Sequence, residues 1–253
     1  MRHCLFCEQS ANSREHIWPD WLLEHLRRSK GKILISGNFD KRVISGIPIT
    51  PGLRTKQVCK TCNHGWMSQL ESASKPLLGL MLHDVASPID ILQQDTLSRW
   101  AVKTAMVMES TANDIYPFYT RQEREQLRLS SKIPDNTAIW LARYTGNNDL
   151  AFAGMHLWND EPERPETIHC YVNTIVFGYV AIQTFTAHLP AGHPTIKIPA
   201  TPGVPWDSLL IRVWPTGTRT VRWPPNMTFS DTGGIIALGD LVERFKPTTA
   251  ASM

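Results

Sequence analysis

Four cysteines in the first quarter of the chain have the spacing of metal ligands. They form two Cys-x-x-Cys pairs, Cys4 with Cys7 and Cys59 with Cys62. Four thiolates in two such pairs can surround one Zn²⁺ as a tetrahedron. The sequence runs from Met1 straight into the first pair without a signal-peptide pattern, so we expect a cytoplasmic protein, where zinc ligands are favoured over disulfides. A thiol redox protein is a weaker alternative, because Cys-x-x-Cys also serves in that chemistry.

Side chains suited to phosphodiester hydrolysis lie between and just after the cysteine pairs. Glu15 and His16 open a Glu-His-Ile-Trp-Pro run, and Asn63 and His64 follow the second pair directly. Histidine titrates near neutral pH, so it can take a proton from water. One carboxylate and one amide oxygen suit a Mg²⁺ ion that keeps most of its water. If the cysteine tetrahedron draws these residues together, they can form a second, catalytic metal centre, and the chain is then a candidate nuclease.

The order Cys-x-x-Cys, Glu-His-Ile-x-Pro, Cys-x-x-Cys-Asn within residues 1–78 resembles the zinc-bearing branch of the HNH endonucleases. The resemblance implies a ββα-metal finger, in which a structural zinc ion holds two strands and a helix together. It also implies that His16 is the general base and that Glu15 and Asn63 bind a catalytic Mg²⁺ or Mn²⁺. His64 is the other possible ligand on the same helix.

One position of the HNH pattern is not filled in this sequence. The family usually places an Asn or His before the second cysteine pair to orient the base, whereas residues 53–58 read Leu-Arg-Thr-Lys-Gln-Val, with Gln57 as the candidate replacement. Two hypotheses follow. The first is a metal-dependent HNH-type endonuclease that hydrolyses DNA. The alternative is a non-catalytic, zinc-stabilised nucleic-acid-binding or adaptor module on the same scaffold.

Basic residues are concentrated in the segment that carries these motifs. Residues 1–78 contain twelve Lys and Arg against six Asp and Glu, whereas the whole chain has a net charge of only +3. A basic segment suits a polyanionic partner, and we expect that partner to be DNA. A short basic run is the candidate phosphate-contacting strip, with a solvated loop as the equal alternative; it contains Arg27, Arg28, Lys30 and Lys32. Cutting both DNA strands with a single finger would also favour a homodimer.

The elements expected to position these residues follow from local sequence patterns. Apolar spacing predicts a helix over 17–28, and the β-branched, glycine-rich stretch 29–57 predicts a hairpin or an extended loop. The second cysteine pair is expected to open a helix over 63–73 that ends before Pro76. We expect these elements to form a first domain, residues 1–78.

Residues 79–253 predict an α+β domain with a mainly antiparallel sheet. Helices are expected over 96–110, capped by Thr96, and over 120–129. Alternating apolar runs predict strands at 137–144, 150–158, 167–187 as two strands hinged near Gly178, 209–213 and 218–223. Asn147-Asn148 predicts a hairpin turn between the first two strands, and the fifth cysteine, Cys170, is expected in the core. The tail 246–253 is expected to be disordered. No apolar stretch is long enough to predict a membrane span.

Overall fold

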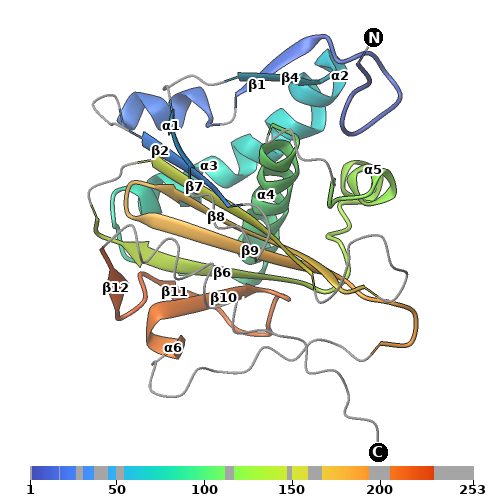
Figure 1. Ribbon diagram of the computed structural model, residues 1–253. Coiled ribbons are helices and arrows are strands. Elements are labelled where there is room, and N and C mark those ends of the chain that lie inside the picture. Colours follow the sequence, from blue (N-terminus) through green and yellow to red (C-terminus); the bar gives the residue numbers. More distant parts are fainter. Residues whose placement is uncertain are drawn as a thin grey trace, which may run out of the picture.

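The computed structural model describes residues 2–16, 18–26, 31–36, 45–49, 54–111, 117–146, 150–158, 167–193 and 206–230. These residues form a mixed α and β fold whose sheets are mainly antiparallel, which confirms the expected fold class at this level (Figure 1). The expected tail at 246–253, the Asn147-Asn148 pair and the basic residues Arg27, Arg28 and Lys30 lie outside the described residues.

A single large sheet forms the centre of the described structure. Seven of its eight strands follow the order β10-β6-β9-β8-β7-β2-β3. The eighth, β12, pairs with the C-terminal end of β6. The strands are β2 Gly31–Ser36, β3 Ser45–Ile49, β6 Thr137–Tyr144, β7 Leu150–Trp158, β8 His169–Phe177, β9 Val180–His188, β10 Leu210–Trp214 and β12 Thr228–Phe229. Separate small ribbons pair β1 Ser13–His16 with β4 Arg54–Val58, and β5 Ser87–Ile89 with β11 Val221–Trp223.

The central hairpin β8–β9 is confirmed, and its turn depends on a glycine. Phe177 pairs with Val180, so only Gly178 and Tyr179 connect the two strands. Gly178 has φ +53°, and a Cβ there would lie 2.6 Å from the side chain of Leu82. The position therefore requires a residue without a side chain, both for its left-handed backbone and for the helix packed against it.

The expected hairpin between β6 and β7 is wrong, although both strands have the predicted bounds. β6 pairs with β9 and β10, whereas β7 pairs with β8 and β2. The β8–β9 hairpin is inserted between the two strands, since a central position lets both of its apolar faces be buried. Strand pairing is thus set by this tertiary arrangement rather than by sequence adjacency.

The segment between the two cysteine pairs also enters the large sheet. β2 and β3 form an antiparallel hairpin. Of the two predictions for residues 29–57, a hairpin or an extended loop, the hairpin is confirmed for these two strands. β2 then pairs with β7 in parallel, with Lys32 opposite Ala151. A domain boundary near residue 78 stays a prediction, and this pairing shows that residues from both sides of it contribute to one sheet.

Two helices, α3 Ser68–Leu82 and α4 Ile91–Glu109, lie across one face of the sheet (Figure 1). The other described helices are α1 Asp20–His25, α2 Lys60–Cys62, the π-helical turn η1 Asn63–Met67, α5 Arg121–Ser130 and α6 Trp206–Leu209. The cap of α5 at Thr120 agrees with the expected helix start, and Glu123 completes a capping box there. None of the helices in the described parts of the chain has the length and apolar character needed to span a bilayer.

Two helices differ from the expectation in their bounds. α4 begins five residues earlier than 96, because Asp90 and Gln93 form the capping box instead of Thr96. The helix expected over 63–73 is kinked at Gly65 and then continues through Pro76 to Leu82. Burial of the apolar side chains beyond the proline, such as Leu78 and Met81, offsets the hydrogen bond that proline cannot donate.

Candidate metal centre and its surroundings

Cys4, Cys7, Cys59 and Cys62 converge at one end of the molecule, with their four Sγ atoms within 4.8 Å of one another. Cys7 Sγ lies 3.6 Å from Cys59 Sγ and 3.7 Å from Cys62 Sγ. A disulfide would need about 2.0 Å. A tetrahedron with Zn–S bonds of about 2.3 Å has edges of about 3.8 Å. The four free thiols therefore match the size of a zinc site and can hold a zinc ion.

Backbone donors point at two of these sulfur atoms. The N–H of Cys62 donates to Cys59 Sγ at 3.4 Å, and the N–H of Phe6 donates to Cys4 Sγ at 3.5 Å. Burial raises the pKa of Cys59, but hydrogen bonds from the Cys62 backbone and the neighbouring thiols outweigh it and lower that pKa. Burial, together with the charge of Cys4, raises the pKa of Cys62. Full ionisation of all four thiols thus calls for a cation among them.

The first cysteine pair is anchored on α5 and on η1. Arg128 Nε of α5 donates to the backbone oxygen of Phe6 at 2.9 Å. The Phe6 ring is buried and meets Trp66 of η1 edge-to-face, with 5.0 Å between ring centroids. The cluster is therefore held by residues far away in sequence and does not depend on the cysteines alone.

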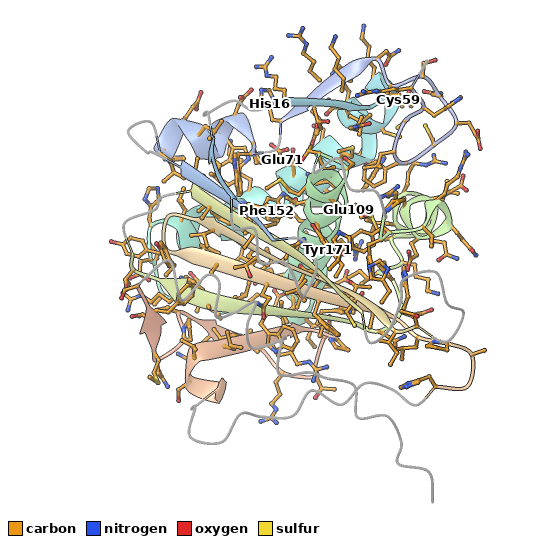
Figure 2. All side chains as sticks on the ribbon, viewed as in Figure 1. His16, Cys59, Glu71, Glu109, Phe152 and Tyr171 are labelled. Atoms are coloured by element: carbon orange, nitrogen blue, oxygen red, sulfur yellow. The ribbon has the colours of Figure 1, made fainter. Side chains whose placement is uncertain are left out.

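The β1–β4 ribbon lies directly beside the cysteines. Ser13 pairs with Val58 at one end and His16 with Arg54 at the other, with an irregularity between Ser13 and Glu15. After Val58 the chain enters α2 through Cys59, whose side chain caps this short helix. Two antiparallel strands thus lead into the short helix that follows Cys59, and β1 carries both Glu15 and His16. Figure 2 shows His16 on this ribbon and Cys59 at its other end.

Asn63 connects the helical side of the cluster to β1. Its Nδ2 donates to Ser13 Oγ at 2.8 Å and approaches the backbone oxygen of Arg14 at 3.4 Å. Because Nδ2 is used in this way, Oδ1 is the oxygen that the side chain offers to a cation. The structure therefore places Asn63 beside the strand that bears Glu15. The neighbouring His64 is exposed.

Glu15 is buried and forms an ion pair with Lys103 of α4. The two side chains are 8% and 3% exposed, and Lys103 Nζ lies 3.6 Å from Glu15 Oε1. Burial raises the pKa of Glu15, the charge of Lys103 lowers it, and the charge of Glu71 on α3 raises it. The expected cation ligand is thus already in contact with a cation that belongs to the protein.

His16 lies next to an acid on the following helix. Its Nε2 is 3.0 Å from Asp20 Oδ1, in the first turn of α1. The His16 side chain is 22% exposed, whereas its neighbour Glu15 is buried, in accord with the alternation of side chains along a strand. His16 therefore contacts Asp20, while Glu15 contacts Lys103.

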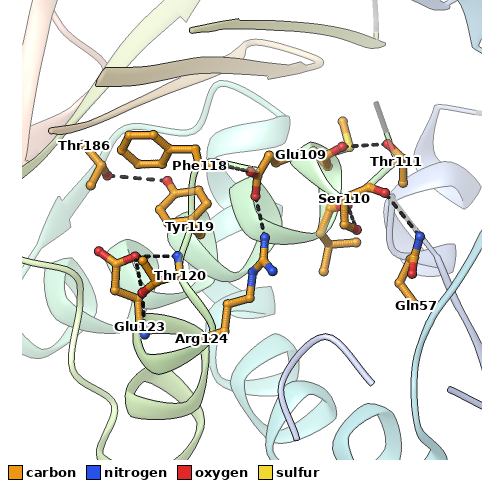
Figure 3. A network of polar contacts seen from close by, with 12 residues as sticks. Gln57, Glu109, Ser110, Thr111, Phe118, Tyr119, Thr120, Glu123, Arg124 and Thr186 are labelled. Carbon is orange, nitrogen blue, oxygen red and sulfur yellow. Dashed lines mark hydrogen bonds and ion pairs between the residues drawn. The ribbon is translucent and has the colours of Figure 1, made fainter. Parts of the chain in front are cut away.

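The Gln57 Nε2 donates to the backbone oxygen of Ser110, just beyond α4, at 3.2 Å, and not to His16 (Figure 3). Asp20 is the residue that takes up a position beside the imidazole instead. Of the basic strip, only the backbone of Lys32 is described, in β2.

Sequence reasoning missed Lys103 as a member of the site. A signal was present, because this lysine interrupts the apolar run from Trp100 to Met108 on a helix whose other faces are also buried. Lysine is almost never fully buried unless it is paired. A lysine inside such a run therefore predicts a buried acidic partner, although it does not say which one.

A second polar cluster lies between α5, the end of α4 and the sheet (Figure 3). Glu109 accepts hydrogen bonds from the backbone N–H of Phe118 and from Arg124 Nη2, the latter at 2.7 Å. Beside it, His156 Nδ1 and His169 Nε2 are 3.0 Å apart on neighbouring strands. The cluster links Phe118 and Arg124 to Glu109 at the end of α4.

No family model, no curated protein and no solved structure matches this chain.

Proposed function

We propose that the chain is a metal-dependent endonuclease of the HNH type, which hydrolyses DNA phosphodiester bonds. One observation carries the proposal: Asn63, directly after the cysteine cluster, is hydrogen-bonded to the strand that bears Glu15 and His16. The three residue types that the chemistry needs are thus held on two adjoining elements. The four cysteines that can hold zinc provide the support for both elements.

Each residue has a role in this proposal. His16 accepts the proton of the attacking water, and Asp20 at 3.0 Å orients the imidazole. Glu15 and Asn63 Oδ1 would hold Mg²⁺ or Mn²⁺, with His64 as a further possible ligand, and this donor set suits a hard divalent cation. When bound, that ion would neutralise charge on the phosphate and the leaving oxygen. DNA as partner and a homodimer for double-strand cutting belong to the same proposal.

A plasmid-nicking assay tests this function. The zinc-loaded chain is incubated with supercoiled DNA and Mg²⁺ or Mn²⁺, and we expect nicked circles to accumulate. His16→Ala is expected to lower the rate by about 10²- to 10⁴-fold, the range of general-base catalysis. His3→Ala is the matched control, because the His3 side chain is exposed and its Nδ1 lies 3.1 Å from the backbone oxygen of Glu8. Equal nicking by wild type and His16→Ala would count against the proposal.

The alternative, a zinc-stabilised DNA-binding or adaptor module without chemistry, is favoured by two observations. Lys103 is already paired with Glu15, and Gln57 is bonded to Ser110 rather than to His16. Under this alternative the zinc-loaded chain binds DNA equally well with and without added Mg²⁺ or Mn²⁺ and never nicks it. Neutralising Arg27, Arg28, Lys30 and Lys32 together should then flatten the dependence of binding on salt, since fewer counterions are released.

A further inference from the structure

The contact between Lys103 and Glu15 joins the strand that carries the proposed metal ligand to a helix that has no role in the proposed chemistry. Glu15 belongs to the β1–β4 ribbon beside the cysteines, and Lys103 lies in the middle of α4 (Figure 2 shows the ribbon above this helix). Both side chains are almost fully buried, so solvent screens their attraction weakly. α4 also contacts the ribbon near its end, where Ser110 accepts from Gln57. The β1–β4 ribbon thus contacts α4 at two points.

Lys103 Nζ is the cation that lies 3.6 Å from Glu15 Oε1. A divalent ion bound to Glu15 would bring a second cation to the same buried carboxylate. The same ion would be repelled by the ammonium of Lys103, because both cations would then be close to one carboxylate.

We propose that Lys103 is a positioning residue that acts as the resident cation of this centre: its ammonium holds the Glu15 carboxylate and competes with the divalent ion for it. The inference rests on the proposed function in that it takes Glu15 as a ligand of the ion. In the absence of the ion, Lys103 holds the Glu15 carboxylate in place through their buried contact. If the ion were bound to Glu15, the carboxylate would have to give up its contact with Lys103, so metal loading and the Glu15–Lys103 contact would exclude each other.

Mn²⁺ affinity of the full, zinc-loaded chain, measured by electron paramagnetic resonance, tests the inference without using nuclease activity. Lys103→Gln removes the positive charge and is expected to tighten Mn²⁺ binding by about tenfold or more. Lys103→Arg is the matched control, which keeps the charge and is expected to bind as weakly as the wild type. Glu15→Gln combined with Lys103→Gln is expected to lose the gain. Equal or weaker Mn²⁺ binding by Lys103→Gln would overturn the inference.

Lys103→Gln leaves Glu15 buried without its partner, so zinc content and circular dichroism must show that this variant folds. If it does not, NMR of the wild type with ¹³C-labelled lysine Cε atoms decides the matter. The Lys103 signal, assigned with Lys103→Arg, is expected to move on titration with Mg²⁺ in the wild type and to stay in place in Glu15→Gln. A signal that stays in place throughout the wild-type titration would contradict the competition.

These results separate the two proposals. Tighter Mn²⁺ binding by Lys103→Gln without plasmid nicking by any variant would uphold the competition and reject the nuclease. Nicking by the wild type with unchanged Mn²⁺ affinity in Lys103→Gln would uphold the nuclease and reject the competition.

Discussion

Asn63 and Ser13 are joined by a hydrogen bond of 2.8 Å between Nδ2 and Oγ. This bond connects the turn after the last cysteine to the strand that leads to His16. Its partners are separated by fifty residues in the chain, so it forms only when the two cysteine pairs have come together. The bond therefore reports on whether the candidate centre is assembled.

Ser13→Ala removes the acceptor while leaving Asn63 in place. We expect a loss of about 0.5–1.5 kcal/mol in the free energy of unfolding, the usual worth of one such hydrogen bond. Urea denaturation gives the measurement. Ser130→Ala is the control, since the Ser130 hydroxyl bonds within an exposed turn of α5 and should contribute less. A larger effect at Ser130 than at Ser13 would mean that the bond does not support the fold.

Zinc content should depend on the four clustered cysteines and not on the fifth. Cys62→Ser is expected to reduce bound zinc from one equivalent per chain to a small fraction of it, as measured by elemental analysis after dialysis, because a three-thiolate site lacks the closed tetrahedron. Cys170→Ala is the control, because Cys170 packs in a separate apolar cluster with residues such as Val172 and Phe185. Zinc retained by Cys62→Ser and lost by Cys170→Ala would contradict the assignment.

Breaking the buried pair of Glu109 and Arg124 should be costly. The two side chains are 1% and 13% exposed, so Glu109→Ala leaves a guanidinium without its counter-ion in the interior. We expect unfolding to become easier by about 3–5 kcal/mol. Glu8→Ala, which removes an exposed ion pair with Arg121, should change stability little. A similar small change for Glu109→Ala would show that the pair is more hydrated than the structure indicates.

Stability should fall in acid because of His169. Burial, followed by the charges of His156 and His188, lowers the pKa of His169 to about 3. The unfolded chain binds a proton near pH 6.5 and the folded chain resists it, so this contribution is complete above that pH and is lost as the pH falls toward 3. For this one group the slope is about 1.4 kcal/mol per pH unit.

The comparison of wild type with His169→Gln isolates this effect from the carboxylates that titrate in acid. Urea midpoints measured from pH 7 downwards should decline more steeply for the wild type. Parallel curves for the two proteins would show that His169 is protonated as easily in the folded chain as in the unfolded chain.

The strands were predictable because their signal is local. Alternating apolar residues gave the bounds of β6 and β7, and the Thr120 cap marked the start of α5. Strand pairing was not predictable in the same way, since adjacency in sequence favoured a β6–β7 hairpin and the structure places β8–β9 between them. Helix ends were missed where burial outweighed a local signal, as at Pro76.

The candidate site shows the same division. Spacing alone predicted that Cys4, Cys7, Cys59 and Cys62 would gather, and the structure brings them together. Contacts that depend on packing were not visible in the sequence, because nothing local links Lys103 to Glu15, 88 positions before it. A cation ligand can be guessed from a motif, but its counter-ion must be found in the fold.

The β2–β3 hairpin has a consequence for how the molecule responds to loss of metal. The two cysteine pairs enclose this hairpin, and β2 runs alongside β7. A zinc ion would therefore close a loop whose middle portion is paired with a strand of the large sheet. Release of the ion would loosen both ends of that loop at once. The change would then affect the outer edge of the large sheet and not the cysteines alone.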